Sequence, residues 1–261
     1  MKKQKPSWLK GIPIDPSKLT LDELRSFKEA DQLLTAHIEG PEGWVYLVRC
    51  FWFLTFFAIA TIEDNRFPPL TRCWNELEEF FMHEKSFDDE IFVPSWIFFD
   101  FPFGEKGQTL LDYFEDFIMQ ADGGENFQYF IEQMRKSRLG VYQEILSSKN
   151  TIKFRELITG NTINTFRNVK EYEKGEIFLT RLVEYEGEVY QFGDPKCWPK
   201  EFKSQIEGFA REKLSYFDGL NTEEKYIKLM KLGGPYWMSC VTSNPDFPIL
   251  DPDHYFRYLR E

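Results

Sequence analysis

The stretch from Val141 to Phe192 reads VYQEILSSKNTIKFRELITGNTINTFRNVKEYEKGEIFLTRLVEYEGEVYQF. It contains five short runs rich in β-branched and aromatic residues, at 141–146, 151–157, 162–168, 176–184 and 188–192. Residues typical of turns separate the runs, at 148–150, 160–161, 174–175 and 186–187. A sheet of five short antiparallel strands removes its exposed edges when it closes on itself. The stretch therefore predicts a small barrel or a strongly curved meander.

Helical patterns flank this module on both sides. A capping box at Thr20–Glu23 begins the first helix, and an aromatic-rich helix is expected over 42–62. Further helices are predicted over 70–84, 109–120, 125–138, 199–217 and 222–232, with a short one after Asp251-Pro252. Between 87 and 103, aromatic residues crowd around Pro94 and Pro102. Because proline interrupts a continuous helix, we expect extended, packed structure there.

The predicted fold class is therefore α+β, with a mostly helical N-terminal part, a five-stranded antiparallel barrel or meander at about 141–192, and a helical C-terminal part. We divide the chain into a helical, aromatic-rich region at 1–139, a β module at 140–195 and a helical region at 196–261. No repeat or low-complexity linker separates them. We therefore expect one compact body.

The composition places the negative charge in one segment. The net charge is −11, and residues 63–134 hold 17 acidic and 4 basic side chains. This segment should repel nucleic acid and anionic membrane, or simply provide a solvated, acidic face. Aromatic residues make up 18% of the chain, enough apolar surface for a core without disulfides or metals.

The run from Trp44 to Ile62 is interrupted by one charge, at Arg49, and is close to the length that spans a bilayer. The internal arginine, the acidic exit and the lack of flanking basic clusters favour a buried helix over a membrane segment. The four cysteines are far apart, and no apolar stretch follows the basic N-terminus as it would in a signal peptide. We therefore expect a cytoplasmic protein that does not contact the membrane.

Several segments between Ser95 and Leu182 follow a recognisable order. They are SWIFFD at 95–100, GQTLL at 107–111, SRLGVY at 137–142, FRELITG at 154–160 and GEIFLTRL at 175–182. This order resembles a group of uncharacterised bacterial proteins, over roughly residues 92–192. Members of that group often carry a C-terminal SEC-C-type zinc motif, which is absent here. The resemblance implies the mixed architecture and a bacterial origin, but it implies no active site and no zinc.

Acidic residues and histidines give the candidates for catalysis. Asp88-Asp89-Glu90 with Asp100, or Asp253 with His254, would suit a metal-dependent hydrolase or nuclease. Each has a simpler interpretation, because consecutive acids are usually solvated and residues 251–254 suit a helix cap. Asp100 lies between two phenylalanines, so it is either buried against an arginine or backbone amides or lines a pocket. No metal-ligand spacing or phosphate-binding glycine pattern occurs, and we predict no metal and no cofactor.

The candidates for binding lie in two places. Trp96 and Phe99 belong to an aromatic-rich segment, and Lys153, Arg155 and Arg181 belong to a β module in which basic and aromatic residues are mixed. The leading hypothesis is a non-enzymatic binding or adaptor protein with a protein partner. The alternatives are the metal-dependent enzyme and binding of single-stranded nucleic acid by the β module.

Overall fold

The structure is a computed structural model that describes residues 19–26, 37–38, 40–64, 68, 71, 92–101, 108–121, 124–148, 150–166, 175–215 and 217–232. The chain divides into two compact units. The first contains residues 1–91 and 102–132, and the second contains residues 92–101 and 133–261. Our expectation of one compact body stays a prediction.

The first unit is built around α3 (Glu42–Glu63), with α1 (Leu21–Arg25), α6 (Leu110–Gln120) and the first part of α7 (Gly124–Lys136). The predicted capping box is present at α1. The Glu23 carboxylate accepts from the Thr20 amide at 2.9 Å, and the Glu23 amide donates to the Thr20 hydroxyl at 3.3 Å. At α6, Asp112 accepts in the same way from the Thr109 amide at 2.8 Å. These local bonds explain where both helices begin.

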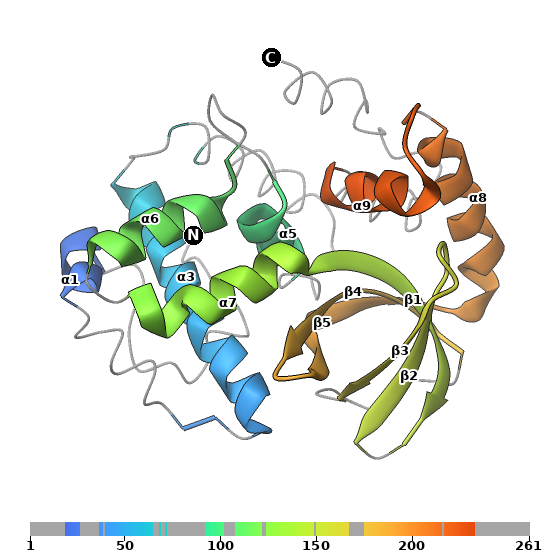
Figure 1. Cartoon of the computed structure of the whole chain (residues 1–261), viewed down its shortest axis with the longest axis horizontal. Coiled ribbons are helices and arrows are strands. Elements are labelled where there is room, and N and C mark those ends of the chain that lie inside the picture. The colour runs from blue at the N-terminus through green and yellow to red at the C-terminus, as the bar shows by residue number, and fades with distance from the viewer. Residues whose placement is uncertain are drawn as a thin grey trace, which may run out of the picture. The chain divides into compact units, whose positions relative to one another are not determined.

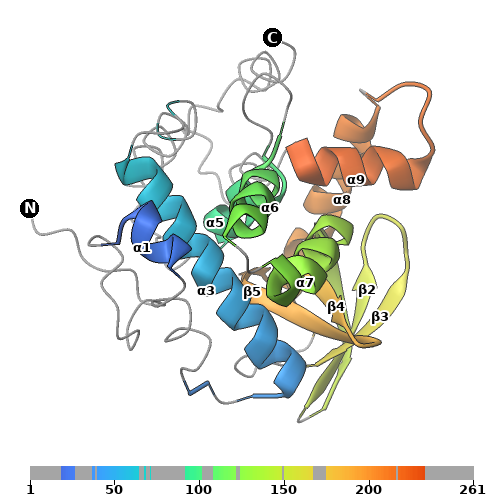
Figure 2. The ribbon, with the colours of Figure 1, turned by 60° about the vertical axis from the view of Figure 1, so that its left-hand side comes forward.

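Phenylalanine side chains from α3, α6 and α7 form the core of this unit, in which Phe53 lies 5.8 Å from Phe114 and 5.0 Å from Phe127 between ring centroids. Figure 1 shows α6 and α7 crossing the long α3, and Figure 2 shows both on the same side of it. Among the described residues, α3 is the one helix long and apolar enough to span a membrane, and 61% of its most apolar window is buried. That burial agrees with the expected core helix.

The segment predicted to be extended contains a helix, so that prediction was wrong. Helix α5 runs from Phe92 to Phe99, and Asp100 continues its last turn by donating its amide to the Trp96 carbonyl at 2.8 Å. Pro94 is compatible with this helix because it falls in the first turn. The amides of a first turn have no partner within the helix, so proline loses no bond there.

The second unit contains the predicted barrel. Its described strands are β1 (Arg138–Ser147), β2 (Thr151–Glu156), β3 (Thr162–Phe166), β4 (Ile177–Tyr185) and β5 (Glu188–Trp198). They form a closed barrel in the order β1-β2-β3-β5-β4. Pairs of neighbours are antiparallel except β3 and β5, which close the barrel through a short parallel contact between Phe166 and Tyr190. The α+β fold class is confirmed.

The inside of the barrel is apolar at its centre, as the alternation in the sequence predicts. Tyr142, Ile152, Phe154 and Phe178 form a buried cluster. On β2, Ile152 and Phe154 alternate with Thr151, Lys153 and Arg155, which are exposed. The turn between β4 and β5 consists of Glu186 and Gly187, which have φ of 51° and 80°. Two positive φ values match the right-handed twist of the flanking strands in a two-residue hairpin.

Helices of the same unit follow the barrel in the sequence. They are η3 (Lys200–Phe202), α8 (Lys203–Leu214) and α9 (Thr222–Leu232), close to the predicted positions. Helix α9 packs on β1, where the Val141 amide donates to the Tyr226 hydroxyl at 2.8 Å, and α5 packs on β5. Both views show the β2–β3 hairpin away from α5 (Figures 1 and 2). The helices predicted over 70–84 and after Asp251 lie outside the described residues.

Candidate functional site

Arg181 is a completely buried cation of the second unit and lies in the middle of β4. Its neighbours two positions away on the same strand face, Leu179 and Val183, are buried and apolar, and Arg181 itself is completely buried. A guanidinium can occupy such a position only when its donors are satisfied and its charge is balanced. Arg181 therefore requires specific partners from the segments that cover the strand.

Three side chains supply these partners, and we call Arg181, Ser95, Asp100 and Ser137 the Arg181 cluster. Arg181 Nε donates to Ser95 Oγ at 3.2 Å, Nη1 donates to Ser137 Oγ at 2.9 Å, and Nη2 forms an ion pair with Asp100 Oδ2. The guanidinium also lies 4.9 Å from the centroid of the Phe99 ring. Each nitrogen of the guanidinium thus has a partner, and all four residues of the cluster are buried.

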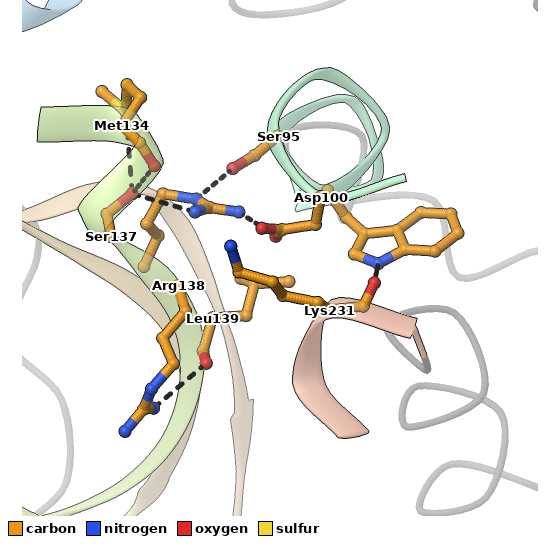
Figure 3. Close-up of polar contacts among 9 residues, drawn as sticks. Ser95, Asp100, Met134, Ser137, Arg138, Leu139 and Lys231 are labelled. Carbon is orange, nitrogen blue, oxygen red and sulfur yellow. Dashed lines mark hydrogen bonds and ion pairs between the residues drawn. The ribbon is translucent and has the colours of Figure 1, made fainter. Parts of the chain in front are cut away.

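The cluster reaches further through hydrogen bonds of its members. The Ser137 hydroxyl donates onward to the Met134 carbonyl at 2.8 Å, at the end of α7. Figure 3 shows the ammonium of Lys231, in α9, facing Asp100. The carbonyl of Lys231 accepts from Trp96 Nε1 at 2.8 Å. Segments far apart in the sequence, from α5, the start of β1, β4 and α9, therefore meet at one point.

Burial and charge act in opposite directions on Asp100. Burial raises the pKa of its carboxyl above 3.8, while the nearby charges of Arg181 and Lys231 oppose the rise. The net direction is upward because the carboxylate is removed from water. This confirms the expectation that Asp100 is a buried carboxylate bound to an arginine. Asp100 therefore belongs to a buried ion pair with Arg181 and is not exposed at the surface.

A second polar group lies at one end of the barrel. Arg138 forms a bidentate pair with Glu156, at 2.5 Å and 3.0 Å, and Glu156 also accepts from the Thr159 hydroxyl. The Arg138 guanidinium lies 4.7 Å from the centroid of the Tyr226 ring. Gly160 has φ of 77°, which suits the turn predicted at Gly160-Asn161, although β2 already ends at Glu156. This pair stabilises the β2–β3 turn and holds α9 against β1.

The predicted site residues thus fall into four groups. Trp96, Phe99 and Arg181, which we expected to bind a partner, are buried and packed by residues of their own unit. Asp100 belongs to the Arg181 cluster, whereas Asp253, His254 and the acids at 88–90 lie outside the described residues. Within the described part of the chain, no three His, Cys, Asp or Glu side chains are arranged to hold a metal ion. Of the predicted site residues that the structure describes, Lys153 and Arg155 alone are exposed.

Lys153 and Arg155 belong to an ordered surface that we call the β2–β3 face. Cross-strand register pairs Thr151 with Phe166, Lys153 with Asn164, and Arg155 with Thr162. Five of these side chains are exposed and Phe166 is half-buried. Phe166 stacks on Tyr190 of β5, with ring centroids 5.3 Å apart and planes 19° from parallel. The face therefore combines two cations, neutral polar groups and an aromatic ring.

The charge on this face differs from that on the rest of the barrel. Within residues 151–166 the single acid is Glu156, which is buried against Arg138. The β4–β5 end of the barrel instead exposes Glu184, Glu186 and Glu188. The two hairpins consequently carry exposed charge of opposite sign.

Sequence reasoning identified Asp100 but missed Ser95 and Ser137, which bind Arg181, and Lys231, which faces Asp100. One pattern indicated the cluster: a single arginine within the apolar run IFLTRLV of β4, which needs a buried carboxylate. Comparison of the chain with protein-family models, with curated proteins and with solved structures finds no match. The case for a function therefore depends on the geometry alone.

Proposed function

We propose that this chain is a non-enzymatic binding protein, and that the β2–β3 face of the barrel is its binding surface. The observation that carries the proposal is the contrast between the two sides of the barrel. Helix α5 packs on β5 and α9 packs on β1, whereas alternate residues of β2 and β3 remain exposed in register.

The buried polar groups support a structural role for the covered side. Asp100 is paired with Arg181 and Glu156 with Arg138, so the buried acids of these two pairs already have cationic partners inside the fold. Buried pairs of this kind hold elements in a defined arrangement. The exposed cations Lys153 and Arg155, in contrast, have no ion pair within the described part of the chain. They are available to an anionic partner.

The layout of the barrel is compatible with this role. A five-stranded barrel of Greek-key type, with β1 between β2 and β4, is the architecture of the OB-fold, in which the strand 2–3 face binds ligands. This is an analogy of fold, and one fold supports many functions. It indicates which face to test, and the charges on that face indicate the type of partner.

The test is quantitative affinity capture with three forms of the full chain. The first is the wild type, and the second carries Lys153→Glu and Arg155→Glu. The third is a control with the same change of charge elsewhere in the unit, Arg211→Glu and Lys228→Glu, at two exposed cations on α8 and α9. We expect the wild type and the control to retain a common partner that the β2–β3 variant loses. Equal retention by all three forms would refute the proposed surface.

A further inference from the structure

We infer that the β2–β3 face binds single-stranded nucleic acid, an inference that rests on the binding function proposed above. Lys153 and Arg155 lie two positions apart on one face of β2, so their backbones are separated by about 6.6 Å along the strand. Two cations in line on one strand can contact successive phosphates of a nucleic-acid strand. Because the exposed part of this hairpin contains no acid, the local field attracts a polyanion.

The aromatic ring at the end of the ladder distinguishes a nucleic acid from other anions. Phe166 is half-buried and is held by its stacked neighbour Tyr190. Tyr190 is in turn fixed by its hydroxyl, which donates to Glu188 at 2.7 Å. A ring held in one orientation loses little freedom when a base stacks on it. Base stacking on aromatic side chains is the interaction by which single strands are bound without regard to sequence.

The neutral residues of the face complete the surface. Thr151, Thr162 and Asn164 are exposed beside the cations and offer hydrogen-bond donors and acceptors to sugars and base edges. A single strand presents unstacked bases that can reach Phe166, whereas the bases of a duplex are covered by each other. The β4–β5 end carries exposed acids, among them Glu188 beside Tyr190, so the attraction is centred on Lys153 and Arg155. The geometry therefore favours a short single strand over a duplex.

The number of phosphate contacts sets the expected salt dependence. Two cations give a slope of about −1.4 in a plot of log affinity against log salt, from about −0.7 per phosphate for single strands. A steeper slope would require further cations outside this face. A flat plot would mean that the cations do not contact phosphate.

The experiment is fluorescence anisotropy of the full chain with a labelled mixed-sequence strand of about 16 nucleotides, as DNA and as RNA. The same sequence as a duplex and poly-glutamate are the comparison ligands. We expect saturable binding of the single strand, weaker binding of the duplex and the salt slope given above. Lys153→Glu with Arg155→Glu should abolish binding, and Arg211→Glu with Lys228→Glu should leave it unchanged.

Phe166 provides the second test, because it separates stacking from charge. Phe166→Leu keeps an apolar side chain of similar size but removes the ring, and it should weaken binding roughly 5- to 150-fold. If poly-glutamate binds as well as the strand and Phe166→Leu has no effect, the partner is an acidic polypeptide and the inference is overturned. The proposed function would survive that result. Absence of binding at low salt, or equal loss in the control variant, would also overturn the inference.

Discussion

Replacing Arg181 with methionine should destabilise the second unit strongly. Methionine retains most of the side-chain length but removes the charge and the donors to Ser95, Ser137 and Asp100. Removing one member of a buried ion pair typically costs about 3–5 kcal/mol, because the other charge remains buried without a partner. In the variant, Lys231 still faces Asp100, and burial favours the protonated form of the Asp100 carboxyl. We therefore expect a loss of stability at the lower end of this range, about 3 kcal/mol.

The matched variant removes both charges. Replacing a buried pair by apolar side chains of similar size is often neutral or stabilising. Adding Asp100→Val to Arg181→Met should therefore restore about 2 kcal/mol or more relative to Arg181→Met alone. The restoration would show that the cost arises from the unpaired carboxylate and not from lost packing around the arginine.

Hydrogen exchange measured by mass spectrometry is the suitable assay, because the chain has two compact units and need not unfold in one step. Peptides that cover α5 and β4 report the free energy of opening at the Arg181 cluster. Urea titration gives an independent value, with a loss of 3 kcal/mol moving the midpoint by about 1–3 M. A change of less than about 1 kcal/mol for Arg181→Met, or a double variant less stable than the single one, would refute the reasoning.

Three other predictions concern groups of the described structure. Because folding raises the pKa of Asp100, the stability that it contributes is present at acid pH and is lost as pH rises from 3.8 toward the folded value. The free energy of unfolding of the wild type relative to Asp100→Asn should fall over that window in paired urea titrations; a rise would show that Arg181 outweighs desolvation. Burial raises the pKa of Cys50 to about 12, so peptide mass spectrometry should find Cys50 unalkylated in the native chain and alkylated in urea. Rapid native alkylation would contradict the burial of α3. Glu144 lies on the inner face of β1, is 3% exposed, and has no hydrogen-bond partner for its carboxylate among the described residues. Glu144→Leu should therefore raise the free energy of unfolding by about 1–3 kcal/mol, while the exposed Glu184→Leu should leave it nearly unchanged.

The sequence predicted the strands well because their pattern is local. The alternation of Ile152 and Phe154 with Lys153 and Arg155 predicts which side chains face inward. Turns that contain glycine indicate where the strands end. The end of β5 was missed because Gly193 and Pro195 indicate a break. In the structure, the register of β4 and β5 shifts at this point, and the shift accommodates a proline that donates no hydrogen bond.

The candidate site was less predictable because its contacts are long-range. Asp100 and Arg181 are 81 residues apart, and Trp96 and Lys231 are 135 apart. Burial of each charge could be inferred from its apolar neighbours, but the choice of partner depends on how α5 packs on the barrel. The exposed ladder of Lys153 and Arg155 was predictable, whereas its register with Asn164 and Thr162 required the structure.

The Arg181 cluster also explains why the second unit is discontinuous in sequence. Residues 92–101 precede the barrel by some distance, yet they belong to the same unit because they supply Ser95 and Asp100 to β4. A fragment comprising residues 133–261 would lack both partners and also the segment that covers Arg181. In the full chain Arg181→Met is expected to destabilise, but in the fragment it should have little effect, because the guanidinium is open to water there and no buried carboxylate is left unpaired. Thermal unfolding of both proteins by circular dichroism tests this difference. The same ordering in the fragment as in the full chain would show that Arg181 stabilises β4 without α5, and the cluster would then not be what joins the helix to the barrel.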